Sequence, residues 1–366
     1  MTVKIKKGKI LLYRVFDIGS EIDLEKVESL FEDNKERFRL DRKHNMSLVI
    51  SKAPVLIQLG KVTINIDNLE QECDLVAKVW HFGALSLSFQ IPILEETSWD
   101  DLISIASWLD KDQSIDEVAL KHAKDFQTKI SAAIPILNDD WSLYEDYVTY
   151  HIQEFSGLDA PLGKLHESVD IPSLLLAEKN VNLSDAIKKM TLESSFQYTN
   201  DDLVVVDWNS ALVVEPKASM DVPLIIEFAL NQLLEVRYYD DLLDERLNKL
   251  YNGVVGKKKS LWNTEYARLA EEAGQIYLEI SEIVENVENS FKTVGDFYLA
   301  QIFRATSKRF RFDDWTRSIN EKLGNLNAVS TLLHSDINEG RNQLMEFTII
   351  VLIAVEVFPF LYNLIF

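Results

Sequence analysis

The chain has 366 residues, enough for two or three domains of ordinary size. Apolar residues make up 47% of it and charged residues 27%, which excludes a disordered chain, and only 12 glycines and 8 prolines favour long helices. The net charge of −21, from 38 basic and 59 acidic residues, argues against nucleic acid as a partner. The single cysteine, Cys73, excludes a disulfide within the chain and a cysteine-based zinc site.

The N-terminal half of the sequence predicts a mixture of strands and helices. Its first apolar run, over residues 10–13, is interrupted by Arg14 too early for the apolar region of a signal peptide. We therefore expect no export, and a strand over 10–16. A helix is predicted over 23–32, followed by strands over 48–50, 55–59, 62–66, 75–82 and 85–91, with Gly60 and Gly83 at turns.

A second series of elements extends to about residue 215. Ser98, with Asp101 three residues later, is typical of a capped helix N-terminus. Strands that form hairpins between helices indicate an α+β fold rather than a doubly wound sheet. We therefore expect an α+β head over residues 1–215, with room for two subdomains. Its later elements are helices over 99–110, 114–134 and 172–192 and strands over 144–155, 196–198, 203–208 and 211–214.

Long helices are predicted beyond Pro223. Apolar residues recur at helical spacing over 222–251, 263–306 and 313–345. The middle stretch is nearly a heptad repeat, but its apolar face is wider than the two-position stripe of a coiled coil and fits an intramolecular bundle. We expect residues 216–345 to form a helical stalk.

The last 20 residues, 347–366, are apolar apart from one formal charge. As a helix they would extend about 30 Å, the thickness of a bilayer hydrocarbon core. The prediction is a single transmembrane helix over 346–366, and the alternative is a buried helix in a soluble oligomer. Residues 304–345 carry seven basic and five acidic residues, so the positive-inside rule leaves the preceding chain cytoplasmic, as in a tail-anchored protein of a bacterial inner membrane.

Glu356 is the one formal charge within this apolar segment. A carboxylate at the middle of a span is costly and normally faces protein or water. The carboxyl could simply be protonated, or the bilayer could thin around it. We favour a third interpretation, in which a protonated Glu356 shares hydrogen bonds with a neighbouring copy and tunes the assembly of a homo-oligomer.

Motifs for catalysis, cofactors and metals give no candidate residues. Gly253 to Ser260 partly matches a phosphate-binding loop, but two residues rather than four separate its glycines, and no strand precedes it. The six histidines (44, 81, 122, 151, 166 and 334) show no metal-ligand spacing, and Cys73 is interpreted as a small core residue. We therefore predict no catalytic residue, no cofactor and no metal ligand.

Four carboxylates occur within six residues at Asp240, Asp241, Asp244 and Glu245. Asp240 and Asp244 would share one helix face, which makes a divalent-cation site possible. The Glu-x-x-His motifs of carboxylate bundles that hold paired metals are missing nearby. A solvated helix face is the preferred interpretation.

The C-terminal half resembles the family named for a protein required for meiotic nuclear division, a domain of unknown function. The resemblance covers about residues 200–366 and depends on a hairpin (203–208 and 211–214), the segment 228–234 and the segment 344–357. Gly295 to Tyr298 departs from the proline-containing stretch that the family more often has. The resemblance implies a membrane anchor and, from eukaryotic relatives, a link to organellar translation, but no catalytic residues.

Together these features predict a membrane-tethered, non-enzymatic assembly or scaffold protein. We expect it to contact the lipid bilayer, to form homo-oligomers and to bind unidentified protein partners, but not nucleic acid. The alternative is a membrane-localised enzyme with an unrecognised site in the α+β head. A concave pocket with converging polar groups would favour the enzyme, and a filled core with an exposed apolar patch would favour the scaffold.

Overall fold

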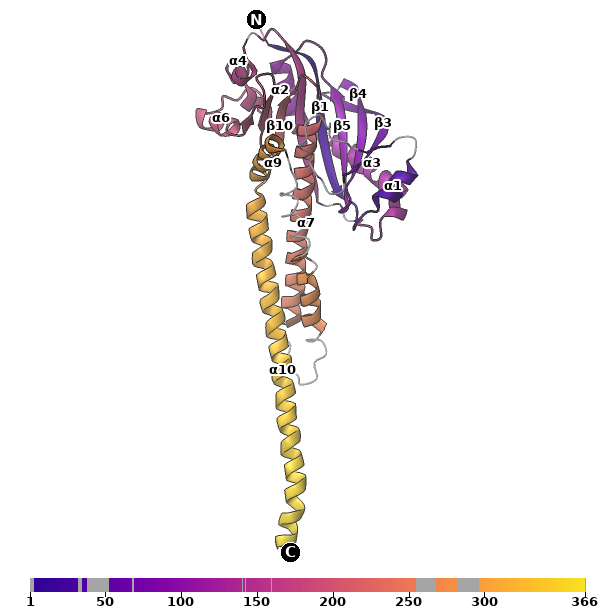
Figure 1. Ribbon diagram of the computed structural model, residues 1–366, viewed down its shortest axis with the longest axis vertical. Coiled ribbons are helices and arrows are strands. Elements are labelled where there is room, and N and C mark those ends of the chain that lie inside the picture. Colours follow the sequence, from indigo (N-terminus) through magenta and orange to yellow (C-terminus); the bar gives the residue numbers. More distant parts are fainter. Residues whose placement is uncertain are drawn as a thin grey trace. The chain divides into compact units, whose positions relative to one another are not determined.

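The chain divides into two compact units (Figure 1). The first comprises Met1–Val236 and Glu288–Phe312, and the second comprises Arg237–Val287 and Asp313–Phe366. The computed structural model describes residues 3–31, 35–37, 53–67, 69–139, 141, 143–158, 160–254, 268–278, 280–281 and 296–365.

Strands and helices alternate in the first unit, while the described elements of the second unit are helices. The described strands are β1 (Lys4–Asp17), β2 (Lys35–Arg37), β3 (Val55–Ile66), β4 (Leu69–Val79), β5 (Ala84–Pro92), β6 (Thr97–Ser98), β7 (Tyr144–Ser156), β8 (Ser195–Phe196), β9 (Leu203–Val206) and β10 (Ser210–Val214). The α-helices are α1 (Leu24–Leu30), α2 (Trp99–Leu109), α3 (Ser114–Ile130), α4 (Leu165–Ser168), α5 (Ile171–Leu175), α6 (Asp185–Leu192), α7 (Asp221–Val254), α9 (Phe297–Arg309) and α10 (Phe312–Ile365). Two 3-10 turns lie at Ser131–Ala133 and Leu162–Lys164.

The strands form one sheet, in the order β2-β3-β4-β5-β1-β7-β10-β9-β8, with the short β6 beside β1. Its neighbouring strands pair in antiparallel fashion except β7 and β10, which are parallel. β1 lies between β5 and β7 at the centre of the sheet, and residues 10–16 of it are all buried. This position explains why its sequence is a nearly continuous apolar run.

One face of the sheet carries the main hydrophobic core. Side chains alternate between the two faces of a strand, and Ile10, Leu12 and Phe16 of β1 point into this core together with residues of α2 and α3. Arg14 lies on the same face, where its Nε donates to Oδ1 of Asp116 on α3 at 2.6 Å. Arg14, which interrupts the first apolar run of the sequence, therefore links the sheet to a helix through a largely buried ion pair.

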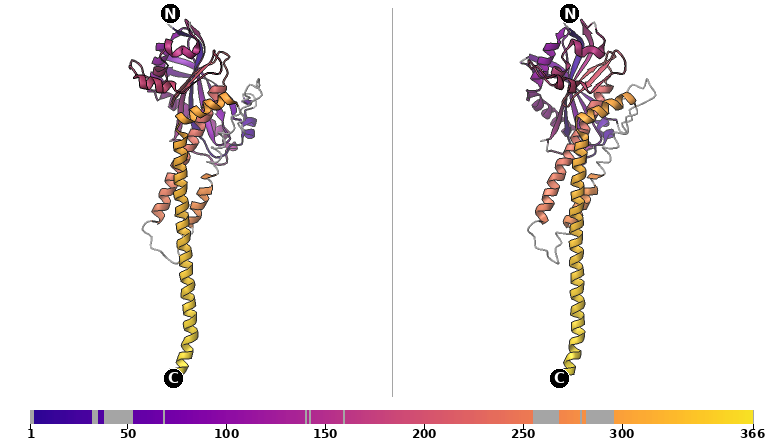
Figure 2. Two further views of the ribbon diagram at one scale, coloured as in Figure 1. Left: turned by 60° about the vertical axis from the view of Figure 1, so that its left-hand side comes forward. Right: turned by 90° about the vertical axis from the view of Figure 1, so that its left-hand side faces the viewer.

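The opposite face is covered by the N-terminal half of α7 and by α9. Phe228 of α7 packs between Trp80, which follows β4, and Phe303 of α9, at ring-centroid distances of 5.4 and 5.6 Å. Tyr147 of β7 meets Phe310, just after α9, in an edge-to-face contact at 5.5 Å. Figure 2 shows this layer from two further sides. The centre of the sheet is thus buried on both faces, whereas Lys61 of β3 and Glu72 of β4 are exposed.

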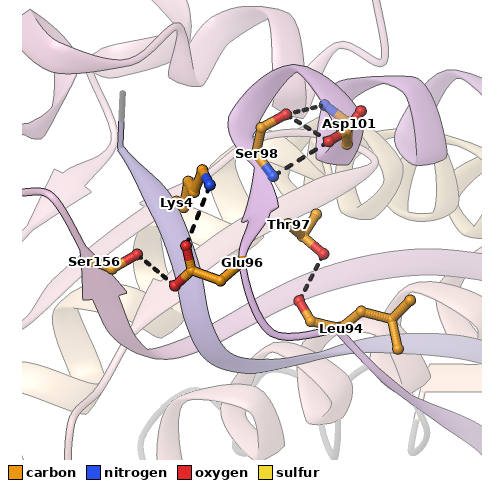
Figure 3. A network of polar contacts seen from close by, with 7 residues as sticks. All are labelled: Lys4, Leu94, Glu96, Thr97, Ser98, Asp101 and Ser156. Atoms are coloured by element: carbon orange, nitrogen blue, oxygen red, sulfur yellow. Dashed lines mark hydrogen bonds and ion pairs between the residues drawn. The ribbon is translucent and has the colours of Figure 1, made fainter. Parts of the chain in front are cut away.

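A polar network fixes the start of α2, as Figure 3 shows. Ser98 and Asp101 form the predicted capping box. Just before it, Glu96 accepts from Nζ of Lys4 at 3.3 Å and from Oγ of Ser156 at 3.0 Å. The beginning of β1, the end of β7 and the N-terminus of α2 are thereby joined at the surface.

The structure differs from the sequence-based predictions at Gly60 and over residues 172–192. Gly60 does not form a turn, because β3 continues through it with a register shift after Gln58 and a left-handed φ of +94° that glycine tolerates. The helical region predicted over 172–192 is two short helices, α5 and α6. The strand predicted over 48–50 lies outside the described residues.

The second unit contains the C-terminal half of α7, helical residues 268–281 with a gap at 279, and α10. Its buried apolar residues include members of the predicted repeat, such as Leu269, Ala273 and Ile280, together with Leu326 and Leu333 of α10. The intramolecular helix packing predicted from the wide apolar face is confirmed for these residues. α10 is one uninterrupted helix of 54 residues (Figures 1 and 2).

No helix among the described residues has an apolar stretch long enough to cross a membrane. Glu346 and Glu356 enclose only nine residues of α10, about 14 Å of helix, against the roughly 30 Å of a hydrocarbon core. The α+β assignment of the head holds. The predictions of a transmembrane helix over 346–366 and of a single-pass inner-membrane location are wrong on the described part of the chain.

Candidate functional site

Polar and charged side chains are buried between the sheet and α7. We call Tyr13, Lys78, Ser86, Glu227 and Asn231 the polar seam. Nζ of Lys78 on β4 pairs with the carboxylate of Glu227 on α7, and only 5% of the lysine side chain and none of the glutamate are exposed. Ser86 of β5 donates through Oγ to the second oxygen of Glu227 at 2.5 Å. Both carboxylate oxygens therefore have a donor.

Alternation along the strands explains why these groups meet. Val76, Lys78 and Trp80 point to the α7 face, whereas Leu75, Ala77 and Val79 point into the main core. Burying an unpaired charge would cost several kcal/mol, so Glu227 in the middle of an apolar helical segment needs a cation opposite it. The paired β4 and β5 supply that cation and a hydroxyl donor.

Tyr13 and Asn231 complete the seam. Nζ of Lys78 lies 6.0 Å from the ring centroid of Tyr13, at the outer limit of a cation–π contact. Burial, and next the negative charge of Glu227, hold the pKa of the Tyr13 phenol well above its ordinary value. Asn231 donates through Nδ2 to the backbone carbonyl of Glu227 at 2.7 Å.

One end of the seam lies at Lys9 and His151, which are register partners on β1 and β7. Burial, and next the charge of Lys9, lower the pKa of His151 to about 4, so the imidazole is neutral at physiological pH. Lys9 donates to Oε1 of Gln90 at 2.8 Å, and burial together with Lys78 lowers its pKa. The imidazole at this end therefore does not titrate near neutral pH.

The other end lies at Asp17 and Glu235. Asp17 follows Tyr13 on the same face of β1, and Glu235 follows Glu227 and Asn231 at four-residue intervals, along one side of α7. Burial raises the pKa of Asp17 to about 6, although the Gly19 N–H donates to its Oδ1 at 3.1 Å. Burial, and next the charge of Asp17, raise the pKa of Glu235 to about 8. At pH 7 this end holds a proton.

The burial of the seam limits its chemistry. Tyr13, Lys78, Ser86, Glu227 and Asn231 are each at most 4% exposed. A substrate could reach them only if α7 left the sheet. The arrangement therefore fits a fixed internal network, and Lys9 at one end and Asp17 and Glu235 at the other are partly open to solvent.

The acidic cluster on α7 has a cation of its own within the second unit. Nζ of Lys322 on α10 lies 2.9 Å from Oδ1 of Asp240 and 2.6 Å from Oδ2 of Asp244. Oγ of Ser318 also donates to Asp240 at 2.7 Å. Asp240 is thus buried in an ion pair between helices, which the preferred interpretation did not predict, whereas Asp241, Asp244 and Glu245 are exposed, as expected of a solvated helix face.

The remaining sequence candidates do not gather into a site. Cys73 lies in the main core, as predicted, and burial raises its pKa to about 12. Among the described residues, no group of three or more His, Cys, Asp or Glu side chains could hold a metal ion. Within the segment Gly253 to Ser260, residues 255–260 lie outside the described part, as does His44.

Glu356 lies on α10 with an exposed side chain, beside a series of exposed apolar residues. Ile350, Leu352 and Val355 are 62–64% exposed. The exposed apolar side chains of this segment are Leu344, Met345, Phe347, Ile349, Ile350, Val351, Leu352, Ile353, Val355 and Val357. We call residues 344–357 the apolar segment of α10.

Sequence reasoning did not identify Lys78 or Glu227 as site residues. A usable signal was present, because Glu227 interrupts an otherwise apolar stretch of α7 between Leu224 and Leu230. A charge inside such a stretch indicates a buried partner. The position of Lys78 on the matching face could not be predicted, because it depends on the pairing of β4 with β5.

The chain belongs to the family described as "Uncharacterized protein MJ0711, N-terminal domain", which matches residues 7–221. It is 24% identical over 217 residues to "Uncharacterized protein MJ0711" of Methanocaldococcus jannaschii, a match that covers 58% of this chain and 65% of that protein. The chain thus spans slightly less than two thirds of that relative's length. No solved structure matches the chain.

The expected resemblance to the meiotic nuclear division family is wrong. The family match lies over residues 7–221, mostly in the part that the resemblance left unassigned. The resemblance depended on a hairpin and on apolar helical stretches near the C-terminus. Such patterns follow from general packing rules, and unrelated folds share them.

Proposed function

We propose that this member of the MJ0711 N-terminal domain family is an assembly protein that associates with further copies of itself through the apolar segment of α10. The observation that carries the proposal is the exposure of ten large apolar side chains within residues 344–357. An isolated helix that displays this much apolar surface is unfavourable in water. Association would cover it.

The distribution of these side chains favours several copies over one partner helix. Residues 349–353 are consecutive and all apolar, so at 100° per residue they face every side of α10. A helix that is apolar on all sides needs neighbours around its whole circumference. Identical copies of α10 in parallel would place their apolar segments at the same level, so we propose a bundle of at least three copies.

A role in self-association is also proposed for Glu356. It lies at the C-terminal end of the apolar segment and would be at the same level in every copy. A polar residue at one interface position of a helical bundle can fix register and copy number at some cost in stability. We propose this role for Glu356, with a protonated carboxyl hydrogen-bonded to a neighbouring copy.

The first unit supports a structural rather than a catalytic role. Its polar seam is buried, and its ion pair and hydrogen bonds satisfy the charged groups internally. The central strands of the sheet are covered by helices on both faces. In the proposed assembly this unit is the rigid part that several copies display together.

Sedimentation velocity of the full-length chain tests the proposal. We expect a species of at least three copies, and monomers for a chain truncated after Gln343. A double substitution, Ile350→Asp with Ile353→Asp, should raise the dissociation constant by roughly tenfold or more, because it places charges in the apolar contact. The matched control is Leu69→Asp with Leu94→Asp, since both leucines are 72% exposed in the first unit.

The control variant should sediment like the parent. A monomeric full-length chain would overturn the proposal, including one that instead binds phosphatidylcholine vesicles. Unchanged association of the Ile350→Asp, Ile353→Asp variant would overturn it as well.

A further inference from the structure

Three buried polar side chains are neighbours on the face of the sheet that α7 and α9 cover. Tyr13 lies on β1, and Thr149 and His151 lie on β7. β1 and β7 are antiparallel with Tyr13 opposite Tyr147, so Thr149 is the diagonal neighbour of Tyr13, and His151 is the next residue on the same face. Tyr13, Thr149 and His151 are each 0% exposed. The pairing of the two central strands therefore places them together inside the protein.

The described residues leave the polar atoms of these side chains without a hydrogen bond. Oη of Tyr13, Oγ1 of Thr149 and both ring nitrogens of His151 have no partner among them. Each hydroxyl can donate one hydrogen bond and accept others, and a neutral imidazole offers one donor and one acceptor. Buried polar groups of native proteins are in the large majority bonded to protein or to ordered water. Such atoms on three adjacent residues therefore point to bound water.

Tyr13 and Thr149 have a polar neighbour in each other, but not a direct hydrogen bond. Burial, and next the charge of Glu227, raise the pKa of Tyr13, and the nearby Thr149 hydroxyl opposes that shift. The two hydroxyls do not have the geometry of a direct bond, and water commonly bridges groups placed in this way. Their register partners on the outer strands are small, Ser88 on β5 and Ala211 on β10, which leaves room for a water molecule.

His151 has a polar neighbour of its own in the segment that leads into α7. Burial, and next the charge of Lys9, lower the pKa of His151, and the backbone of Ser219 opposes that shift. Neither ring nitrogen forms a direct hydrogen bond to this backbone. A water molecule between them would satisfy the imidazole.

We infer that Tyr13, Thr149 and His151 bind a short chain of ordered water molecules between the sheet and the helices that cover it. This water lies beside the buried ion pair of the polar seam, since Nζ of Lys78 is 6.0 Å from the ring centroid of Tyr13. Part of the contact between sheet and helices is then made through water, whereas Lys78 and Glu227 meet directly. The inference is independent of the association of α10.

Thr149→Val tests the inference by the sign of its effect on stability, because it replaces a hydroxyl with a methyl group of similar size. If water is bound, the substitution removes one of its partners, and we expect the folding equilibrium constant to fall by roughly fivefold. A dry site predicts the opposite sign, since the same substitution would then remove an unpaired buried hydroxyl. Urea denaturation of the full-length protein measures the constant.

Tyr13→Phe should also lower the folding equilibrium constant. Combined with Thr149→Val, the two losses should not add, because both substitutions remove partners of the same water. The matched control is Thr63→Val on β3, where the threonine is exposed and the change should have little effect.

A high-resolution crystal structure of the full-length protein supplies a readout that does not depend on the folding of any variant. We expect water density within hydrogen-bond distance of Oη of Tyr13, Oγ1 of Thr149 and a ring nitrogen of His151. The inference is overturned if no water is bound there, including the case in which the two hydroxyls bond directly to each other. It is also overturned if Thr149→Val is as stable as the parent or more stable.

Discussion

Two helices of this protein differ in which side chains they bury. The first half of α7 buries Glu227, Asn231 and Gln232 completely or nearly so, while the C-terminal part of α10 exposes ten large apolar side chains. Composition alone would predict the reverse. The difference lies in what each helix has opposite it: α7 faces strands that offer a cation and a hydroxyl, whereas the side chains of the apolar segment of α10 are 38–67% exposed. The exposed segment is therefore the one that calls for a partner.

The largest effect should come from breaking the buried ion pair. Lys78→Met leaves the Glu227 carboxylate buried without a cation and should lower the free energy of unfolding by about 3–5 kcal/mol. Adding Glu227→Leu should recover most of that loss, because the pair is then replaced by apolar groups. Urea denaturation followed by circular dichroism measures both variants.

The exposed pair Lys61–Glu72 provides the control for this prediction. Both of its side chains are 67% exposed, so Lys61→Met should change the stability by less than about 1 kcal/mol. Equal losses for Lys78→Met and Lys61→Met would show that burial of the seam has no energetic consequence.

A second prediction concerns pH and Glu235. Its folded pKa of about 8 lies above the ordinary value of 4.5, so the folded state binds more protons between these values. The stabilisation is present in full below about pH 4.5 and is lost as the pH rises through 8. Urea denaturation from pH 5 to 9 should show this decline, and Glu235→Gln should flatten it above pH 6. A parent whose stability rises over that range would contradict the assignment.

A third prediction, with a smaller effect on the free energy of unfolding, concerns the hydrogen-bonded hydroxyl of Tyr147. The Tyr147 hydroxyl lies 2.9 Å from the backbone carbonyl oxygen of Asp207 and 2.7 Å from that of Ser210, and donates to them. Tyr147→Phe should therefore cost about 1 kcal/mol of unfolding free energy. The control is Tyr198→Phe, which removes a hydroxyl from a side chain that is 73% exposed and should have no measurable effect. A loss of the same size in both variants would argue against this role of the hydroxyl.

The smallest effect on stability is expected in α10. Glu356→Leu should leave the unfolding of the first unit unchanged within about 0.5 kcal/mol, because Glu356 is exposed on a helix of the second unit. It should nevertheless change the distribution of oligomers in chemical cross-linking, since we propose that this residue fixes copy number. A distribution of oligomers identical to that of the parent would contradict the proposed role of Glu356 in fixing copy number.

Local patterns in the sequence predicted most of the elements. The Ser98–Asp101 capping box, the central strand β1 and the long helices α7 and α10 follow from short-range rules. The polar seam could not be predicted from such rules, because its residues come from β1, β4, β5 and α7. The pairing of these strands depends on contacts between distant parts of the sequence. The same limit explains the error at Gly60, which has the local pattern of a turn but lies within a continuous strand paired with β4.

The error at the C-terminus has a different origin. An apolar run satisfies the same hydropathy criterion whether lipid or protein covers it. The sequence alone did not show that residues 344–357 belong to one long helix, α10, on which their apolar side chains are exposed. Composition therefore does not identify what covers the apolar segment of α10, and an association experiment is needed to test the proposed contact between copies.

Cysteine cross-linking at Ile353 tests the association of α10 most directly. Cys73 can stay in place, because it is 3% exposed and its pKa is raised to about 12. In a parallel bundle, residue 353 of one copy lies beside residue 353 of the next, with helix axes about 8–10 Å apart. Ile353→Cys should therefore form a disulfide between copies under mild oxidation at low protein concentration, whereas Leu69→Cys should not. Failure of Ile353→Cys to cross-link, or equal cross-linking of the two variants, would contradict the account.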